Sequence, residues 1–376
     1  MAITLLILVI LAAIFWIAII ILPIRPTATE QRLDVNAACS AGDLNAVTAL
    51  IPARNEARTI ALTLSSLRRQ CAALKIIVVD DQSTDQTARI VTNQPGAIRL
   101  IEGTPTPAGW LGKVWALEQG LAEVNTPLVL LLDADIEMSP NFVVCLQEKL
   151  EREQLALVSV MARLRTASAW ERLLVPAYIF FFKLLYPFAL VNSRRTGVAA
   201  AAGGCMLMRT AVLNDIGGFA ALRGAIIDDC ALAGLIKRAG YPIWLGLTNS
   251  VRSMRAYETL DDFWNLVARS AFAELKFSVS RLLLCSAAML ILFCAPVVTP
   301  FAADGAAVYI SIVAALAMLI SYLPVLRFYS LHPSRALTLP VVAIGYLAMT
   351  WSAALRYWFG KPTIWKDRAY RNIGEY

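Results

Sequence analysis

The sequence holds few of the residues from which many catalytic and metal centres are built. It has one histidine, His332, in the apolar carboxyl-terminal part, so a histidine-based site is not expected. Its seven cysteines are odd in number and no two have CxxC spacing, which indicates neither a disulfide framework nor a zinc site. Charged residues make up only 16% of the chain and hydrophobic residues 58%, too apolar for a wholly soluble protein. The 376 residues therefore accommodate one substantial globular domain together with membrane segments.

The first apolar run, Met1–Leu22, carries no charge and is long enough to cross a hydrocarbon core of about 30 Å. A cleavable signal peptide fits less well, because the run has no basic region ahead of it and no small-residue cleavage site after Leu22. We therefore expect a transmembrane anchor over residues 1–24. Arg25 and Arg32 follow it closely and place the downstream chain in the cytoplasm.

The carboxyl-terminal part, residues 282–358, is again apolar and predicts transmembrane helices in a multi-pass protein of the cell inner membrane. Its three candidate spans are Leu282–Phe301, Ala307–Leu326 and Leu337–Trp358. Four spans in all would leave the tail, residues 359–376, outside the cell, whereas its basic residues favour the cytoplasm. One hydrophobic segment could instead be re-entrant or interfacial, and this alternative stays open. The net charge of +7 is explained by basic loops beside anionic lipid headgroups, without nucleic acid as a partner.

Between these apolar parts, a polar linker over residues 25–45 precedes a cytoplasmic domain over residues 46–281, in which strand-like and helix-like segments alternate. The strands are expected at 46–51, 75–79, 128–132 and 155–162, and the helices at 57–70, 84–92, 114–124 and 141–153. This βαβαβ order predicts an α/β fold with a mostly parallel, doubly wound sheet. Two aromatic segments, near 170–191 and 261–280, are expected to be interfacial helices. The alternatives are a buried acceptor-side helix for the first and an ordinary core helix for the second.

Pairs of aspartates occur at three places where an apolar strand or a tight turn gives way to a loop. They are Asp80 and Asp81, Asp133 and Asp135, and Asp228 and Asp229. If the first two strands are parallel, their acidic ends meet at one edge of the sheet, where open α/β sheets bind ligands. Carboxylates that gather with ligand phosphates are the usual surroundings of Mg²⁺ or Mn²⁺. In an extended segment, moreover, Asp133 and Asp135 would point to the same side and could reach one cation.

Each pair also has a purely structural explanation. Asp80–Asp85 could form a turn in which Ser83 or Thr84 caps the next helix. Asp228 or Asp229 could cap the helix that follows and favour its positive end. Asp133 by itself could be a surface loop residue. It is the recurrence of the three pairs that favours a functional site.

Five motifs in a fixed order make the chain resemble the family 2 glycosyltransferases of the GT-A fold. They are IPARNE (Ile51–Glu56), VVDDQSTDQT (Val78–Thr87), GWLGK (Gly109–Lys113), DAD (Asp133–Asp135) and DD (Asp228–Asp229). The GWLGK motif makes the chain similar to the ceramide glucosyltransferase-like branch of this family. The bacterial hopene-associated glycosyltransferases resemble the chain most closely, since they too have an amino-terminal anchor and carboxyl-terminal spans. The resemblance covers roughly Ala46–Phe277 by motif.

The resemblance implies roles for the residues on the donor side. A nucleotide-sugar would bind in a pocket lined by Pro52, Arg54 and Glu56, with Asp81 and Asp80 contacting its base or ribose. Lys113 would lie near the phosphates or the sugar, unless it is a solvated loop lysine. Asp133 would face the donor, and Asp135 together with Asp133 would bind a divalent cation, Mg²⁺ or Mn²⁺. The cation would stabilise charge on the departing nucleoside diphosphate.

On the acceptor side, the resemblance makes Asp229 the catalytic base of an inverting transfer, which takes the proton of an acceptor hydroxyl. Gly203, Gly204 and Asp228 would belong to the acceptor region, although the two glycines could simply form a turn between strands. Many relatives carry Gln/Arg-x-x-Arg-Trp after the base. Here the segment is LVARS, in which Arg269 is a candidate diphosphate contact and Ser270 stands in place of tryptophan. The sequence thus gives no support for processive polymer synthesis.

Together these features predict a membrane-bound inverting glycosyltransferase that moves a sugar from a nucleotide-sugar, expected to be a UDP-sugar, to a lipid acceptor. The resemblance suggests a hopanoid-related acceptor. A polyprenyl-phosphate glycosyltransferase is the alternative enzyme, for which Arg194 and Arg195 would supply extra basic residues. A non-catalytic membrane scaffold that keeps a nucleotide-binding fold is the alternative from another class, and Ser270 is the feature that favours it.

Overall fold

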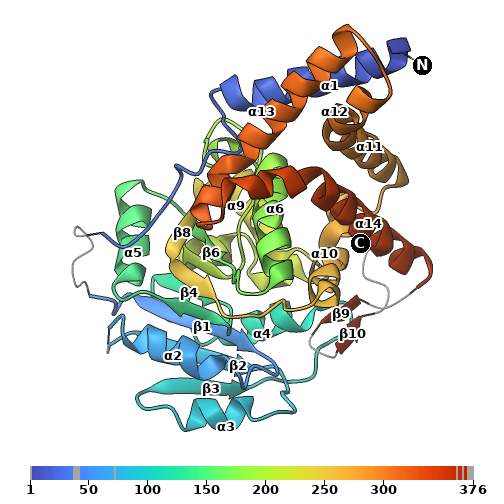
Figure 1. Ribbon diagram of the computed structural model, residues 1–376. Helices are drawn as coiled ribbons and strands as arrows, with labels where there is room; N and C mark the ends of the chain where they lie inside the picture. Colours follow the sequence, from blue (N-terminus) through green and yellow to red (C-terminus); the bar gives the residue numbers. More distant parts are fainter. Residues whose placement is uncertain (1, 37–42, 72, 361–362, 366–367, 371–376) are drawn as a thin grey trace. The chain divides into compact units, whose positions relative to one another are not determined.

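The computed structural model describes residues 2–36, 43–71, 73–360, 363–365 and 368–370, and the chain divides into two compact units (Figure 1). The sheet unit comprises Gln31–Arg165, Leu190–Ala256 and Ile364–Tyr376. The helical unit comprises Met1–Glu30, Thr166–Ala189 and Tyr257–Thr363. These units cut across the expected domain of residues 46–281, because the segments near 170–191 and 261–280 belong mostly to the helical unit.

Within the described residues of the sheet unit, eight strands form one mixed sheet in the order β3-β2-β1-β4-β7-β6-β8-β5. The strands are β1 (Val47–Ala53), β2 (Lys75–Asp80), β3 (Ile98–Glu102), β4 (Leu128–Leu132), β5 (Ile136–Met138), β6 (Leu157–Arg163), β7 (Cys205–Arg209) and β8 (Ile243–Ser253). Strands β3, β2, β1 and β4 are parallel, as β6 and β8 are to each other, whereas β7 runs antiparallel to β4 and β6, and β5 to β8. The predicted mostly parallel α/β sheet is therefore confirmed.

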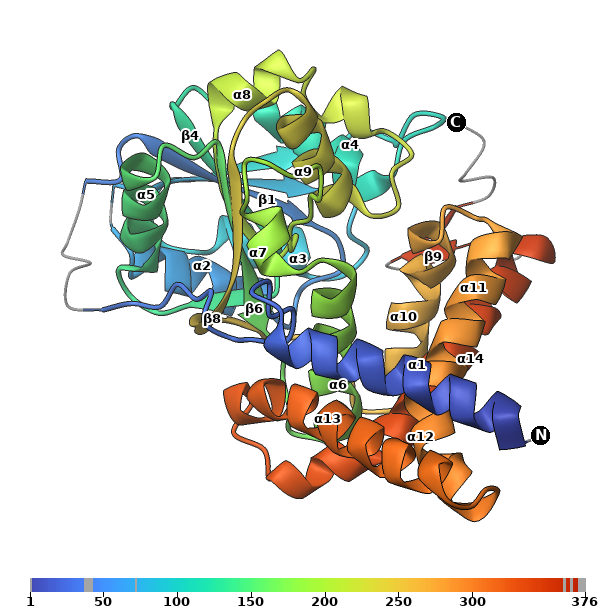
Figure 2. The ribbon, with the colours of Figure 1, turned by 90° about the horizontal axis from the view of Figure 1, so that it is seen from above.

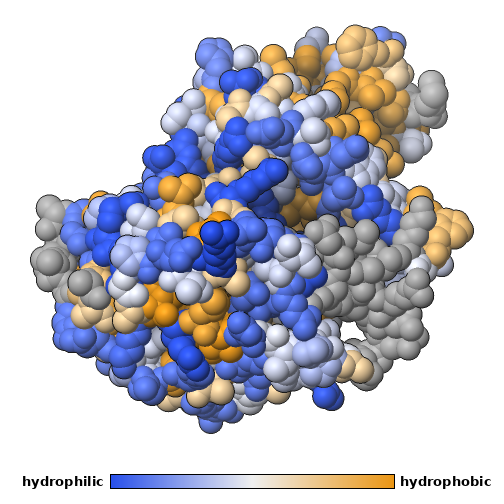
Figure 3. Space-filling model, turned by 90° about the horizontal axis from the view of Figure 1, so that it is seen from below, coloured by the Kyte–Doolittle hydropathy of each residue, from blue (hydrophilic) through white to orange (hydrophobic). Residues whose placement is uncertain are grey.

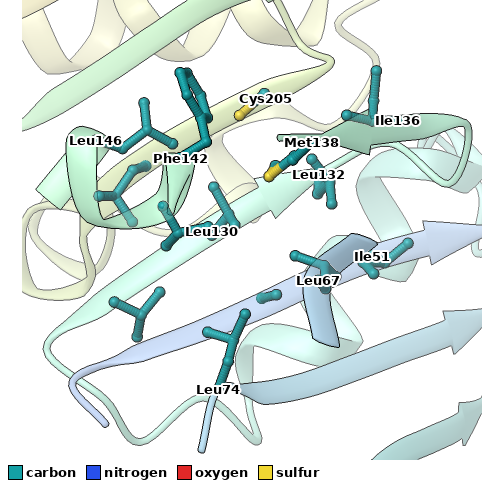
Figure 4. Packing of buried hydrophobic residues seen from close by; sticks show 14 of the residues in the cluster. Ile51, Leu67, Leu74, Leu130, Leu132, Ile136, Met138, Phe142, Leu146 and Cys205 are labelled. Atoms are coloured by element: carbon teal, nitrogen blue, oxygen red, sulfur yellow. The ribbon is translucent and has the colours of Figure 1, made fainter. Parts of the chain in front are cut away.

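Helices cover both faces of this sheet, and the alternation of side chains along β1 shows how. Ala49 and Ile51 join the hydrophobic cluster formed with α2 (Ile60–Arg68) and α5 (Phe142–Arg152), part of which is seen in Figure 4. Leu50 points to the other face, where its side chain lies against Gly120 of α4 (Gly112–Leu121). Successive side chains of a strand point to opposite faces, so a strand buried on both sides is apolar throughout. Further helical segments of this unit are α3 (Thr87–Thr92), α8 (Thr210–Asp215), η1 (Phe219–Leu222) and α9 (Asp228–Arg238), and α7 (Phe188–Val191) has residues in both units.

Strand β1 extends beyond its predicted end at residue 51 and runs through Pro52 to Ala53. The ladder with β4 ends at Leu50, so the missing N–H of Pro52 is not needed on that side. Strands β3, β5, β7 and β8 were not predicted. In β3, for example, only partly buried and exposed residues alternate, so it carries no apolar run.

Cys145 on α5 is disulfide-bonded, so the exclusion of disulfides from cysteine spacing is wrong at this position. Free thiols are present at Cys71, Cys205, Cys230, Cys285 and Cys294. Cysteine pairing depends on which residues the fold brings close together, and spacing along the chain does not reveal this.

The polar segment of residues 25–45 is not a simple linker, because part of it is hydrogen-bonded to β8. The backbone N–H of Leu33 donates to the carbonyl of Leu247 at 3.0 Å. The Oδ1 atom of Asp34 accepts hydrogen bonds from the backbone N–H of Asn249 at 2.6 Å and from the Thr248 hydroxyl at 2.9 Å. Residues 37–42 of the expected linker lie outside the described residues.

Replacing Asp34 by alanine is expected to lower the stability of the fold by about 1–3 kcal/mol, because hydrogen bonds to a charged group are among the stronger ones. The measurement is the melting temperature of the purified protein in detergent. Glu30→Ala is the matched control, since the Arg25–Glu30 ion pair is exposed and such pairs contribute little. Equal melting temperatures for the two variants would contradict a structural role for Asp34.

The helical unit contains, within the described residues, four helical segments that are long and apolar enough to cross a membrane. They are Ile3–Ile21, Val279–Phe301, Ala306–Phe328 and Pro333–Trp358. Its helices are α1 (Ala2–Ile21), α6 (Ala169–Leu185), α10 (Leu260–Glu274), α11 (Val279–Met289), α12 (Ala295–Val298), α13 (Ala306–Phe328) and α14 (Leu339–Trp358). Helices α1 and α13 run side by side (Figure 2). Large exposed hydrophobic side chains belong almost entirely to this unit, and Figure 3 shows such residues gathered on one part of the surface.

Helix α6, which covers most of the aromatic segment near 170–191, is packed inside the helical unit. Phe180 stacks on Trp16 of α1, and the carbonyl of Leu174 accepts a hydrogen bond from the Tyr346 hydroxyl of α14 at 2.9 Å. The helix is not one of the four candidate spans. The expected basic tail lies largely outside the described residues.

Candidate active site

Strands β1, β2 and β4 are parallel, so their carboxyl ends lie at the same edge of the sheet. This edge carries most of the residues selected from the sequence. Asp80 is the last residue of β2, Asp133 follows β4 directly, and Arg54 and Glu56 follow β1. The parallel register explains how acidic residues that are far apart in the sequence come to lie at one edge.

At the ends of β1 and β2 the two loops are tied together. The Arg54 guanidinium donates to the carbonyl oxygens of Asp81 and Gln82 at 2.6 and 2.8 Å. The carboxylate of Asp80 is buried, and its Oδ2 atom accepts the Ser83 N–H at 3.1 Å. Its Oδ1 atom is also buried and has no hydrogen-bond partner among the described residues. Buried acceptors are nearly always satisfied, so the Oδ1 atom of Asp80 is an exception among the described residues.

The capping role considered for Ser83 or Thr84 is not observed. Helix α3 begins only at Thr87, whose N–H donates to Oδ1 of Asp85 at 2.9 Å. Ser83 instead accepts the backbone N–H of Asn55 at 3.0 Å, which joins it to the loop after β1.

Lys113 lies in the first turn of α4 and links two of the three acidic pairs. Its Nζ atom is 2.9 Å from Oδ1 of Asp133 and 3.4 Å from Oδ2 of Asp228. Loss of hydration lowers the pKa of Lys113, but the neighbouring carboxylates of Asp133, Asp228 and Asp229 outweigh this and raise it. The lysine is therefore charged and held in place, with a side chain only 21% exposed, and is not a solvated loop residue.

Arg255, which sequence reasoning missed, makes the corresponding link for Asp135. Its Nε atom is 2.9 Å from Oδ2 of Asp135, and its Nη2 atom is 2.9 Å from Oε1 of Glu56. An arginine two residues after a strand has no local pattern that identifies its partners. Only the position of β8 beside β5 brings Arg255 to this edge, with Ser253 paired to Ile136.

The expectation that Asp133 and Asp135 are held in an extended segment is wrong. The Asp-Ala-Asp residues form a turn between β4 and β5, with the Ile136 N–H donating to the carbonyl of Asp133 at 3.3 Å. The alternation of a strand does not apply there, and the two carboxylates contact different cations, Lys113 and Arg255. Nor does the described part of the chain contain a group of three or more His, Cys, Asp or Glu side chains placed to hold a metal ion.

Asp229 lies in the first turn of α9 and accepts two backbone hydrogen bonds. Its Oδ2 atom accepts the Gly203 N–H at 2.7 Å, and its Oδ1 atom accepts the Cys230 N–H at 2.8 Å. Loss of hydration and the charge of Asp228 raise the pKa of Asp229 to about 6, while Lys113 and the two N–H donors oppose the rise. A carboxylate with this pKa can accept a proton near neutral pH.

Gly203 and Gly204 lead into β7, and Gly203 allows the close approach of the charged groups around it. A Cβ atom at this position would lie 3.1 Å from Oδ2 of Asp229 and 3.3 Å from Nζ of Lys113. The carbonyl of Gly204 accepts the Asp133 N–H at 3.1 Å, which connects the glycines to the end of β4. The pair is thus a turn before a strand and also part of the charged cluster.

Replacing Gly203 by alanine is expected to reduce any activity that depends on Asp229 about tenfold or more, because a misplacement of about 1 Å can cost much of the catalysed rate. The measurement is the initial rate of transfer. Gly197→Ala is the control, since a Cβ atom at Gly197 meets nothing within 4 Å. A Gly203→Ala rate equal to that of the control would show that the close approach has no importance.

Arg269 lies on α10 in the helical unit, whereas the residues described above belong to the sheet unit. Its expected contact with a diphosphate stays a prediction.

Comparison with known proteins shows which family part of the chain resembles. Residues 48–217 match the family described as Glycosyl transferase family 2. The 4,4′-diaponeurosporenoate glycosyltransferase of Staphylococcus aureus (strain USA300) is 37% identical over 91 residues, which cover 24% of this chain and 24% of that protein. The protein of the same name from Staphylococcus haemolyticus (strain JCSC1435) is 30% identical over 93 residues, 25% of each chain. The matched segment therefore spans about a quarter of the length of these relatives.

Among solved structures, the mannosyltransferase PcManGT from Pyrobaculum calidifontis, in complex with GDP-Man and Mn²⁺, superposes with a TM-score of 0.53. The comparison covers 94% of this chain and 98% of that one at 17% sequence identity. Such a low identity shows similarity of the fold only. The sheet order, the match over residues 48–217 and this likeness agree with one another. The sheet unit therefore has the GT-A fold, and residues 48–217 of the chain are similar to family 2 glycosyltransferases.

Proposed function

We propose that the protein is a membrane-bound, inverting glycosyltransferase that moves a sugar from a nucleotide-sugar to a lipid acceptor at the cytoplasmic face of the inner membrane. The observation that carries the proposal is Asp229, a carboxylate with a pKa of about 6, held by the Gly203 N–H beside Lys113. It lies at the carboxyl-terminal edge of a sheet of the glycosyltransferase family 2 type, where ligands of open α/β sheets bind.

On the donor side, the proposal is supported by the loops after β1 and β2. Pro52 and Arg54 flank a buried pair of aspartates, Asp80 and Asp81, and the unfilled Oδ1 position of Asp80 suits an N–H or O–H donor of a base or ribose. The sugar and phosphates would then extend towards Lys113. The solved structure of the Pyrobaculum protein is a complex with GDP-Man. For this chain we expect a UDP-sugar as the donor.

A divalent cation, Mg²⁺ or Mn²⁺, is proposed to accompany the donor. Among the described residues, Asp133 pairs with Lys113, and Glu56 and Asp135 both pair with Arg255, so a diphosphate would add negative charge to a site with three carboxylates. Asp133 and Asp135 offer the hard oxygen ligands that these cations prefer, and the other ligands would be phosphate oxygens and water. When bound, the cation would stabilise negative charge on the leaving nucleoside diphosphate.

In the transfer itself, Asp229 is proposed to take the proton of the acceptor hydroxyl as its oxygen attacks the anomeric carbon. The bond from this carbon to the phosphate oxygen breaks on the opposite face, so the configuration at the carbon is inverted and the nucleoside diphosphate leaves. Lys113 lowers the pKa of Asp229 and so favours the ionised form of the proposed base. Gly203 and Gly204 leave room for the acceptor, and Asp228 raises the pKa of the base.

The lipid nature of the acceptor is supported by the four membrane-span candidates and by the named relatives, glycosyltransferases of 4,4′-diaponeurosporenoate, a lipid-like carotenoid. A hopanoid-related acceptor remains the more specific proposal. The position of Arg194 does not support the alternative in which the acceptor is a polyprenyl phosphate. This arginine donates to the carbonyl of Glu153, ahead of β6, at the sheet edge opposite to Asp133.

The proposal is tested by incubating the purified protein in nanodiscs containing bacterial lipid extract with a panel of nucleotide-sugars, and analysing the lipids by mass spectrometry. One sugar donor is expected to give a glycosylated lipid that is stable to mild acid. Adding EDTA is expected to reduce the rate at least about 100-fold, and excess Mn²⁺ to restore it, because a metal ion supplies several kcal/mol of charge stabilisation. An acid-labile product would indicate a phosphate acceptor, and no product with any donor would contradict the proposal.

A further inference from the structure

Arg255 lies between two buried carboxylates at the edge where the donor and its cation are proposed to bind. Two of its three guanidinium nitrogen atoms, Nε and Nη2, are each 2.9 Å from a carboxylate oxygen, Nε from Asp135 and Nη2 from Glu56. The side chains of Asp135 and Glu56 are only 7% and 11% exposed. Carboxylates removed from water need a counter-charge inside the protein, and a single guanidinium serves both of them.

The backbone around this arrangement is fixed on both sides. The Met254 N–H donates to the carbonyl of Asp135 at 2.8 Å, which holds the chain just ahead of Arg255. The backbone N–H of Glu56 donates to the Thr87 hydroxyl at 2.8 Å. Of the three side chains, the long side chain of Arg255 is the most exposed, at 31%, and it has several rotatable bonds.

A divalent cation bound to Oδ2 of Asp135 would compete with the Arg255 guanidinium for that oxygen. The Oδ2 atom already contacts Nε of Arg255, and a cation bound at about 2.0–2.2 Å from the same oxygen would face a like charge only a few ångström away. A nucleoside diphosphate changes this balance, because its negative charges attract both cations and supply further oxygen ligands for the metal.

We infer that Arg255 is the resident counter-cation of Asp135 in the donor-free site, and that the divalent cation replaces it at Asp135 only when a nucleoside diphosphate binds. This inference rests on the proposed function and extends it. Glu56 retains Arg255 during the exchange through its separate contact with Nη2. The protein therefore binds Mn²⁺ together with its nucleotide and discriminates against Mn²⁺ alone.

The test measures Mn²⁺ affinity of the full-length protein in detergent, from the electron paramagnetic resonance signal of free Mn²⁺, without nucleotide and with UDP or GDP. The wild type is expected to bind Mn²⁺ at least about tenfold more tightly with one of the diphosphates, within the usual range of coupling between ligands. Arg255→Met is expected to bind Mn²⁺ alone about tenfold more tightly than the wild type. Arg252→Met, which replaces an exposed arginine of β8 three residues before Arg255, is the control and should behave as the wild type.

Two further variants make the result specific. Arg255→Lys keeps the charge on a single nitrogen that cannot contact both carboxylates in the same way, so its Mn²⁺ affinity should lie between those of the wild type and Arg255→Met. Adding Asp135→Asn to Arg255→Met should abolish the gain, because the gain depends on that carboxylate. Circular dichroism shows whether each variant is folded. If Arg255→Met is not folded, the Mn²⁺ affinity of Arg255→Lys is compared with that of the wild type instead.

The inference is overturned if Arg255→Met and Arg252→Met bind Mn²⁺ alone equally well, or if the wild type binds Mn²⁺ equally tightly with and without a diphosphate. Neither result touches the transfer reaction, which is measured separately with the lipid assay. If no protein binds Mn²⁺ even with UDP or GDP, the inference and the proposed cation requirement fail together. If lipid transfer fails while the Mn²⁺ results hold, the error lies in the proposed acceptor or reaction.

Discussion

Asp229→Asn is expected to reduce sugar transfer about 10²–10⁴-fold, the range over which a general base contributes to a rate. The amide oxygen of asparagine can still accept the N–H of Gly203 or Cys230, so the local structure should persist while the proton acceptor is lost. The measurement is the initial rate of lipid glycosylation, with nucleotide binding followed separately by calorimetry. A scaffold protein without catalytic activity would lose nothing in this variant, and full transfer activity would contradict the assignment of Asp229 as the base.

The wild-type pH profile tests the same residue in another way. A base must be ionised to accept a proton, and the pKa of Asp229 is raised to about 6 by loss of hydration and by Asp228. The rate should therefore rise as the pH increases from about 5 to 7 and level off above that. The acid limb should be absent from the residual activity of Asp229→Asn. An acid limb that stays near pH 4 in the wild type would mean that the pKa is not raised.

The same pKa rise predicts a gain in stability for Asp229→Asn. The pKa of Asp229 is about 6 in the folded protein and near 3.8 when unfolded, so the folded protein binds more protons between these values. Wild-type stability therefore falls as the pH rises from about 4 to 6, by about 1–3 kcal/mol. Asp229→Asn has no carboxylate to ionise and so does not lose this stability. It should therefore have a higher melting temperature than the wild type at pH 7.5. A stabilised but inactive variant would show that the lost activity is not a result of unfolding.

Lys113→Met should have the second largest effect, a loss of about 10²–10³ in rate at pH 7. Lys113 contacts the carboxylates of Asp133 and Asp228 and lowers the pKa of Asp229. Its removal takes away a positive group beside the proposed diphosphate, and losing one such stabilising group typically costs this much. It also moves the acid limb of the pH profile above pH 6, because Asp229 then holds its proton more tightly.

The stability of Lys113→Met should fall by about 1–3 kcal/mol, since two carboxylates are left without their partner. Lys75→Met is the matched control, because the Lys75 side chain is exposed and contacts only Asn125 among the hydrogen bonds described. Transfer rates are measured from pH 5 to pH 9 for both variants. A profile of Lys113→Met with an unchanged acid limb would contradict the electrostatic coupling between Lys113 and Asp229.

The sequence located the first part of the sheet well and its second part poorly. Strands β1, β2 and β4 are apolar on both faces and were found close to their bounds, since a strand buried between two layers of helices must be apolar throughout. Strands β3 and β5 were missed because one is only partly buried and the other has three residues. Strands β7 and β8 were missed although each carries a buried run, because the regular alternation of strands and helices ends before them.

The acidic residues of the site were also found from the sequence, but not their partners. Asp80 at the end of β2 and Asp133 just after β4 indicate a polar site at one sheet edge, because that position follows from parallel order alone. The turn at Asp133–Asp135 was read as extended because side-chain alternation was assumed to continue beyond β4. The attachment of Asp34 to β8 was missed because its partners are more than 200 residues away.

What the sequence by itself determined is the set of groups that this protein uses: apolar runs that can span a membrane, parallel strands, and carboxylates where those strands end. Such properties depend on hydrophobic pattern and local order, which neighbouring residues specify. Only the tertiary structure decided which charges meet, as when Arg255 reaches Asp135 and the Gly203 N–H reaches Asp229. The energy of these contacts depends on distance and on exclusion from water, and both arise only when segments remote in the chain pack together.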